Sequence, residues 1–343
     1  MLQMSTIVSA LVLVASCSDW LEPQSLGSDG TPGTEGGGMV YDKPSDAYAE
    51  NIRQYFNTPH RVLHGWFGNW TGLGKTALTA LPDSMDFVSL WGCRGGLSPE
   101  QYADLKAFQA RGSRAVLCWR AGDIGTALTP EGANYADIWG FPAGSHNDVN
   151  KLKEGARRYA MAIVDTCRKY GINGFDYDYE DGGTLTDIKE VLNTFLLTLA
   201  DEFDKDGSWL IVDFNLTTRA SRNNFEDLTD EVSERCKYLI WQCYDYNDPR
   251  TAVTRLRDTR NHTPETNENA IKKSIFTWSL EGDFSTSYFT TGAQNLANMG
   301  IECGGVGAYH IEYDYDPDAG STITYPKLRK CIAVLNPPIG VLE

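Results

Sequence analysis

The stretch Gly171-Ile172-Asn173-Gly174-Phe175-Asp176-Tyr177-Asp178-Tyr179-Glu180 determines how this chain is interpreted. Successive side chains of an extended strand alternate between its two faces. Asp176, Asp178 and Glu180 therefore share one face, and the aromatic residues between them share the other. Carboxylates this close together raise the pKa of at least one of them, and a carboxyl group that keeps its proton near neutral pH can act as an acid. The pattern predicts a catalytic strand.

A solvated acidic loop and a calcium site are the alternatives for this segment. A solvated loop does not require the strict alternation of acids with aromatic residues. An EF-hand register that starts at Asp176 puts Asp181 where the turn glycine belongs, and one that starts at Asp178 puts Gly182 at a ligand position. Neither register fits, so we expect no metal here.

The segment resembles the DGxDxDxE signature of glycoside hydrolase family 18, which includes chitinases and endo-β-N-acetylglucosaminidases. It matches at Gly174, Asp176, Asp178 and Glu180. Asn173 occupies the position where the family usually has Asp. The missing charge bears on how Asp176 and Asp178 share a proton, and we expect Asn173 to be supporting rather than essential.

The rest of the chain predicts an α/β fold, a (β/α)8 TIM barrel that forms a single catalytic domain. Strand-like segments alternate with helical ones, which is typical of a parallel sheet with crossover helices. Eight strands suit a closed barrel, and Glu180 ends the fourth strand on the face where such barrels build their active sites. The strand candidates are Arg61–Phe67, Met85–Trp91, Arg114–Trp119, Ile172–Tyr179, Trp209–Leu216, Tyr238–Tyr244, Ser274–Leu280 and Gly305–Ile311.

Composition narrows the choice of partners. The chain has 343 residues, 33 of them Gly, and a formal charge of −16. This negative charge disfavours nucleic acids and anionic lipid surfaces, and it suits a neutral substrate such as a sugar.

The first 43 residues have the composition of a targeting signal and a tether. Residues 1–17 are uncharged and end in Val14-Ala15-Ser16-Cys17, which resembles a bacterial lipoprotein cleavage box with Cys17 as the acylated residue. Residues 18–43 are rich in Gly, Ser and Thr, so we expect a flexible tether before the barrel domain at 44–343. We therefore expect an exported protein that is lipid-anchored to the bacterial outer membrane, with the leaflet left open. The remaining seven cysteines lack CxxC spacing and are expected to be buried thiols.

Further candidate residues lie at other strand ends. Gln242-x-Tyr244 on the sixth strand resembles the endo-β-N-acetylglucosaminidase branch more than the Met-x-Tyr-Asp pattern of many chitinases, although Asp245 keeps the chitinase alternative open. Tyr309 stands where chitinases commonly have a Trp beneath the sugar. Among the tryptophans near strand ends we select Trp278 as a sugar contact. Residues 65–71 and 82–92 resemble exported proteins of Bacteroides-type bacteria, so the resemblance spans most of residues 58–343.

The resemblance implies substrate-assisted catalysis with no cofactor and no metal. Glu180 would be the general acid and base, Asp178 would hold the acetamide N–H of the sugar, and Asp176 would tune Asp178. Tyr244 and Gln242 would orient the acetamide carbonyl. The configuration at the anomeric carbon should be retained.

The expected function is cleavage of GlcNAc-β-1,4-GlcNAc, above all in the chitobiose core of N-glycans, by a monomer that takes an N-acetylglucosamine-containing glycan or glycoprotein. Hydrolysis of chitin oligomers is the alternative within the family. A surface glycan-binding lipoprotein without turnover is the alternative outside it. Asn173 and the tether favour the binding protein, whereas retention of Glu180 favours the enzyme.

Three other motifs are weak. Gly74-Lys75-Thr76 lacks the earlier glycine of a phosphate loop, and His60 and His64 lack the glutamate of an HExxH site. The acids at positions 314, 316 and 318 lack an EF-hand register and predict a solvated loop at the barrel mouth.

Overall fold

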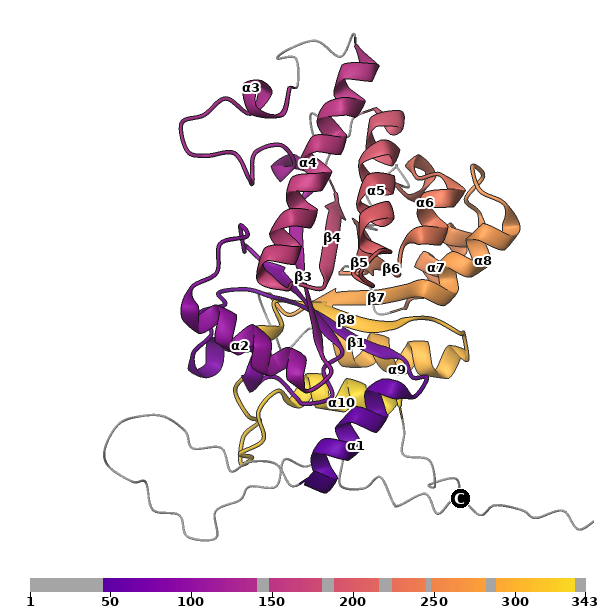
Figure 1. Cartoon of the computed structure of the whole chain (residues 1–343). Coiled ribbons are helices and arrows are strands. Elements are labelled where there is room, and N and C mark those ends of the chain that lie inside the picture. The colour runs from indigo at the N-terminus through magenta and orange to yellow at the C-terminus, as the bar shows by residue number, and fades with distance from the viewer. Residues whose placement is uncertain are drawn as a thin grey trace, which may run out of the picture.

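Eight parallel strands close into a barrel in the computed structural model, which describes residues 46–140, 148–180, 188–215, 224–244, 248–281 and 288–336. The strands follow chain order, and β8 pairs with β1 (Figure 1). The predicted (β/α)8 barrel is confirmed, as are all eight strand candidates. The strands are β1 (Val62–Phe67), β2 (Phe87–Trp91), β3 (Arg114–Arg120), β4 (Gly174–Tyr179), β5 (Trp209–Asn215), β6 (Tyr238–Gln242), β7 (Ser274–Ser279) and β8 (Gly305–Tyr309).

Helices surround the barrel, and local sequence sets their ends. Ser98 begins the second helix in a capping box with Gln101, and Gly171 ends the fourth in the left-handed conformation at φ 67°. In the described part of the chain the helices are α1 (Asp46–Asn57), α2 (Pro99–Ala110), α3 (Tyr135–Trp139), α4 (Val149–Tyr170), α5 (Lys189–Phe203), α6 (Asp230–Arg235), α7 (Arg250–Arg257), α8 (Pro264–Lys273), α9 (Phe289–Met299) and α10 (Pro326–Leu335). None of these helices is long and apolar enough to span a bilayer.

Side chains divide into an interior layer and an outer layer by their position along each strand. Alternate residues of the strands point inward and form a small apolar cluster inside the barrel. The residues between them pack against the helices in a much larger outer core. The interior cluster consists of Val62, Trp66, Phe87, Val116, Cys118, Ile211, Ile240 and Ile275.

A polar network closes the floor of the barrel, at the amino ends of the strands. Asp86 accepts hydrogen bonds from Leu63 N at 2.8 Å and from His60 Nε2 at 2.6 Å. Asn336, which follows α10, accepts from Arg61 N at 3.0 Å and donates to Arg61 O at 2.8 Å. Helix α1 joins this network through the Tyr55 hydroxyl group, which donates to Asp86 Oδ2 at 3.4 Å. The two ends of the described chain therefore meet at the floor, opposite the carboxyl ends of the strands.

The cysteines within the described ranges are all free thiols. Six of these seven side chains are buried and Cys93 is half-buried, so the expectation of buried thiols is confirmed for this part of the chain. The predicted signal segment, Cys17 and the tether lie outside the described residues.

Candidate active site

Strand β4 places two carboxyl groups inside the barrel and a third at its mouth. Asp176 is fully buried and Asp178 is 3% exposed. Glu180 follows the strand directly and is half-buried. Tyr177 points the opposite way and contacts Phe195 of α5, with ring centroids 5.9 Å apart. The predicted alternation of acids and aromatic residues is therefore confirmed.

Asp176 is held at the centre of the barrel by hydrogen bonds. Its Oδ2 accepts from Ser89 Oγ at 2.6 Å and from Trp66 Nε1 at 3.2 Å. Because Ser89 gives its proton to the carboxylate, it accepts from His64 Nε2, 3.0 Å away. Burial lowers the pKa of His64 to about 3, so this imidazole is neutral. Burial also raises the pKa of Asp176 to about 6, although its hydrogen bonds oppose the change.

Asp178 has a pKa well above its usual range. Burial is the largest cause, and the charges of Glu180 and Asp176 come next. The positive charge of Arg120, at the end of β3, opposes this shift and lowers the pKa of Asp178. The predicted effect of crowded acids is therefore present, but it is secondary to desolvation. A neutral Asp178 before substrate binds is the state that this environment favours.

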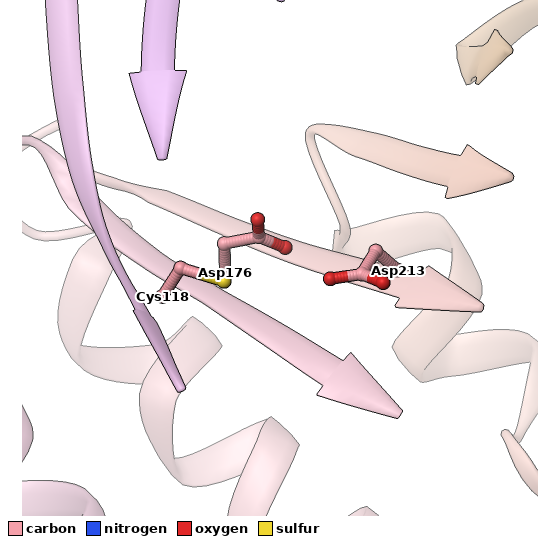
Figure 2. A group of neighbouring side chains, drawn as sticks. All are labelled: Cys118, Asp176 and Asp213. Atoms are coloured by element: carbon pink, nitrogen blue, oxygen red, sulfur yellow. The ribbon is translucent and has the colours of Figure 1, made fainter. Parts of the chain in front are cut away.

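Asp213 on β5 is a fourth carboxyl group that the sequence analysis missed. It pairs with Asp178 in the register of β4 and β5 and is fully buried. Gln242 Nε2 donates to Asp213 Oδ1 at 2.7 Å and lies 3.5 Å from Asp178 Oδ1. Figure 2 shows Asp213 beside Asp176 and Cys118, and the sulfur and carboxylate oxygens lie within 4.8 Å of one another. The sequence feature that could have revealed Asp213 is its position as the single acid within the apolar run Leu210–Phe214.

The aromatic side of the mouth is formed by Tyr244 after β6 and Tyr309 on β8. Their rings stack with centroids 6.1 Å apart, and Trp91 of β2 meets Tyr309 edge-on at 5.4 Å. Burial raises the pKa of Tyr244 well above its usual value, so its hydroxyl group remains a donor. The acidic residues Asp178 and Glu180 act on the pKa of both tyrosines and therefore lie near them. The structure thus brings together Glu180, Asp178, Asp176, Gln242, Tyr244 and Tyr309.

Trp278 does not belong to this group, and its prediction as a sugar contact is wrong. The indole is fully buried in the outer core. A Cβ added to Gly292 of α9 would lie 2.1 Å from Trp278 Cζ2, which shows how closely the helix packs on the ring. Thr277 and Ser279 occupy the inward positions of β7. The tryptophan near a strand end that does line the mouth is Trp91.

Asn173 lies away from the carboxyl groups, and its expected influence on their shared proton is not supported. Its Oδ1 accepts from Gln109 Nε2 at 2.8 Å and from Ala115 N at 3.0 Å. These bonds tie the start of β4 to α2 and β3. Asn173 therefore supports the barrel by joining two strands at their amino ends.

The weak motifs have structural roles in the described part of the chain. Asp314 is buried and accepts from Leu328 N at 2.9 Å and Lys327 N at 3.3 Å, at the start of α10. The expectation of a solvated loop is thus wrong for Asp314, whereas Asp316 and Asp318 are exposed. Asp245, on which the chitinase alternative partly rests, lies outside the described residues.

Comparison with known proteins identifies the family. The profile of glycoside hydrolase family 18, BT1044-like, matches residues 33–207. A solved structure of a selenomethionine Glu-to-Gln variant of BT1044 is 32% identical, with a TM-score of 0.70 over 85% of this chain and 92% of that one. No curated protein sequence matches the chain.

More distant structures share the fold. An endo-β-N-acetylglucosaminidase of Cordyceps militaris, solved with fucosyl-N-acetylglucosamine-Asn, is 19% identical with a TM-score of 0.62, covering 86% of this chain and 98% of that one. A family 18 chitinase of Pseudoalteromonas aurantia is 13% identical with a TM-score of 0.53, covering 80% of this chain and 100% of that one. The acidic strand, the closed barrel and these matches agree: the chain belongs to glycoside hydrolase family 18, BT1044-like.

Proposed function

We propose that this protein is an endo-β-N-acetylglucosaminidase that cleaves the GlcNAc-β-1,4-GlcNAc bond of the N-glycan core. The observation that carries this proposal is the position of Glu180, half-buried at the carboxyl end of β4, beside the buried Asp178 and the stacked pair Tyr244 and Tyr309. An acid in this position can reach a bond at the barrel mouth, and the residues beneath it are shielded from water.

Catalysis would use the substrate's own acetamide group as nucleophile. Glu180 would protonate the glycosidic oxygen while the acetamide carbonyl oxygen attacks the anomeric carbon, which forms an oxazolinium ion and breaks the bond to the leaving sugar. Water would then open this ring, with Glu180 accepting the water proton. Two displacements at the same carbon retain its configuration.

The neighbouring groups would position the acetamide. An ionised Asp178 would accept its N–H and stabilise the positive charge of the oxazolinium ion. The Tyr244 hydroxyl group, with Gln242 beside it, would hold the carbonyl oxygen in the attacking geometry. Gln242 already donates to Asp213, so a large part of its contribution is to fix the carboxyl groups.

The choice of N-glycans over chitin rests on Gln242-x-Tyr244 and on Tyr309 in place of Trp. The ligand of the Cordyceps structure is a core fragment of an N-glycan, which supports the same class of substrate for a protein of this fold. A chitin-oligomer hydrolase and a binding protein without turnover remain outcomes of the test.

Digestion of a defined panel tests the proposal. High-mannose and complex N-glycoproteins and chitin oligomers are incubated with the protein and with its Glu180→Gln variant, and the products are identified by mass spectrometry. Release of glycans that carry a single reducing-end GlcNAc by the wild type alone supports the proposal. Cleavage of chitin oligomers only, or binding without cleavage, contradicts it.

We also propose that the protein is exported and anchored through acylated Cys17. Helix α1 lies at the floor of the barrel, so a tether before it would join the domain at the end opposite the mouth. Metabolic labelling with a fatty acid, compared between the wild type and Cys17→Ser, tests the anchor. Equal labelling of both would contradict it.

A further inference from the structure

Asp213 has no role in the proposed mechanism, although it lies close to the other carboxyl groups of the site. It lies on β5, directly opposite Asp178 of β4 in the strand register, and its side chain is fully buried. The charges of Asp176, Asp178 and Glu180 all act on it. It also lies close to Cys118 of β3 and accepts from the Gln242 amide of the neighbouring β6, and the guanidinium of Arg120 acts on the adjoining Asp178.

The hydrogen bonds around Asp176 and Asp213 leave one oxygen of each unaccounted for. Asp176 Oδ2 accepts from Ser89 and Trp66, and Asp213 Oδ1 accepts from Gln242. Asp176 Oδ1 and Asp213 Oδ2 are buried and make no hydrogen bond within the described residues. The Cys118 thiol and Asp213 nevertheless lie close enough to Asp176 to lower its pKa, and Asp213 has the same effect on Asp178. Buried polar atoms without partners are rare because each costs free energy of desolvation.

A proton between the two oxygens would give each of them a hydrogen-bond partner. Two ionised carboxylates can only accept, so they repel each other in a site of low dielectric constant. When one of them is protonated, its O–H donates to the other and both oxygens gain a partner. We propose that Asp213 is a further positioning residue of the active site, which shares one proton with Asp176 across Asp176 Oδ1 and Asp213 Oδ2 and so leaves Asp178 as the carboxyl group free to ionise.

A metal ion is the competing occupant of this place, since Cys118, Asp176 and Asp213 offer ligand atoms close together (Figure 2). Burial raises the pKa of the Cys118 thiol well above its usual value, so the sulfur keeps its proton and is a poor ligand. The nearby groups Ser89, Trp66 and Gln242 all donate hydrogen bonds to the carboxyl groups, whereas a cation would be surrounded by acceptors. A proton matches these neighbours better.

The shared proton has a consequence for catalysis, which rests on the proposed function. With one proton between them, Asp176 and Asp213 carry one negative charge instead of two. When Asp178 releases its proton to solvent at the barrel mouth, it ionises beside a smaller negative charge, and the Arg120 guanidinium favours its carboxylate. The acetamide N–H of the substrate would meet a carboxylate there at the moment when positive charge develops on the sugar.

Infrared spectroscopy of the full chain without substrate tests the proton itself. Protein labelled with ¹³C-aspartate shows the C=O band of protonated Asp separately from Glu. At neutral pH the Asp213→Asn variant should lose intensity in this band relative to the wild type, whereas the control Thr277→Val, an inward-facing change on β7, should retain it. Unchanged intensity in both Asp213→Asn and Asp176→Asn would show that neither carboxyl group carries the proton in the wild type, which overturns the proposal. A bound cation would give the same overturning result.

Two further measurements keep the test decisive. If Asp213→Asn does not fold, Asp176→Asn should lose the same band, because its amide would donate to an ionised Asp213. In the activity assay Asp213→Ala should fall at least about tenfold below Asp213→Asn, because the Asn amide can replace the donated O–H and Ala cannot. Equal losses in the two variants would indicate a packing role only. Since the infrared result needs no substrate, it stands or fails independently of the proposed function.

Discussion

Tyr244 and Tyr309 stack on each other at the carboxyl ends of β6 and β8, with ring centroids 6.1 Å apart and planes inclined by 21°. The two rings have different tasks in the proposed mechanism. Tyr244→Phe removes the donor to the acetamide carbonyl and should lower kcat by about 10²–10³-fold, as expected for the loss of one oriented donor. Tyr309→Phe keeps the aromatic ring, so its kcat should fall by less than about tenfold. Steady-state kinetics on one N-glycan substrate compares them, and equal losses would contradict this division.

Glu180→Gln should abolish turnover while the barrel stays folded. The amide cannot donate a proton to the leaving oxygen, so kcat should fall by about 10²–10⁴-fold or more. Binding of the intact glycan, measured by calorimetry, should survive. The exposed Glu302→Gln is the matched control and should behave as the wild type. Retained activity in Glu180→Gln would assign the acid to another residue.

Trp278 should affect stability rather than sugar binding. Its indole is fully buried against Gly292, so Trp278→Ala should lower the free energy of unfolding by about 3–5 kcal/mol. Gly292→Ala should also destabilise the protein, because its new methyl group would overlap the ring. Urea unfolding measures both changes. A change in KM with unchanged stability would place Trp278 in the substrate site after all.

Asn173→Asp should be tolerated and Asn173→Ala should not. The Asp variant keeps an oxygen that accepts from Gln109 Nε2 and Ala115 N. The Ala variant leaves both donors without their partner and should cost about 1–3 kcal/mol. Thermal unfolding compares the two variants. If Asn173→Asp instead moved the pH profile of activity, Asn173 would be coupled to the carboxyl cluster.

Asp314 should make stability depend on pH. Burial raises its pKa to about 7, so the folded state holds a proton that the unfolded chain loses above about pH 4. Its contribution to stability is therefore fully present below that pH and is lost as the pH rises towards 7. In Asp314→Asn the free energy of unfolding should decline less between pH 4 and pH 7 than in the wild type, because the amide does not titrate. Urea unfolding between pH 4 and pH 7 measures the difference, and identical slopes for both proteins would contradict it.

The sequence predicted the parts of the site that follow from alternation and missed those that depend on pairing between strands. Asp176, Asp178 and Glu180 could be recognised from the sequence because they occupy every second position of a single strand. Asp213 is a lone acid, and only the register of β4 and β5 shows that it faces Asp178.

Two wrong expectations have simple physical reasons. On β7 apolar residues occupy both faces, so composition could not tell which face meets the helices, and Trp278 was assigned to the wrong one. Asn173 lies three positions before Asp176, and an odd offset places two residues on opposite faces of an extended strand. That inference was available from spacing alone.

Closure of the barrel joins β1 to β8, where Val62 pairs with Gly305 and Leu63 with Val306. During translation β1 is made before the other seven strands, and its partner β8 is made after all of them. Until then the unpaired edge of β1 can associate with other chains. The barrel therefore stays open until β8 has emerged from the ribosome, and any need for a chaperone to cover the edge of β1 should end at that point.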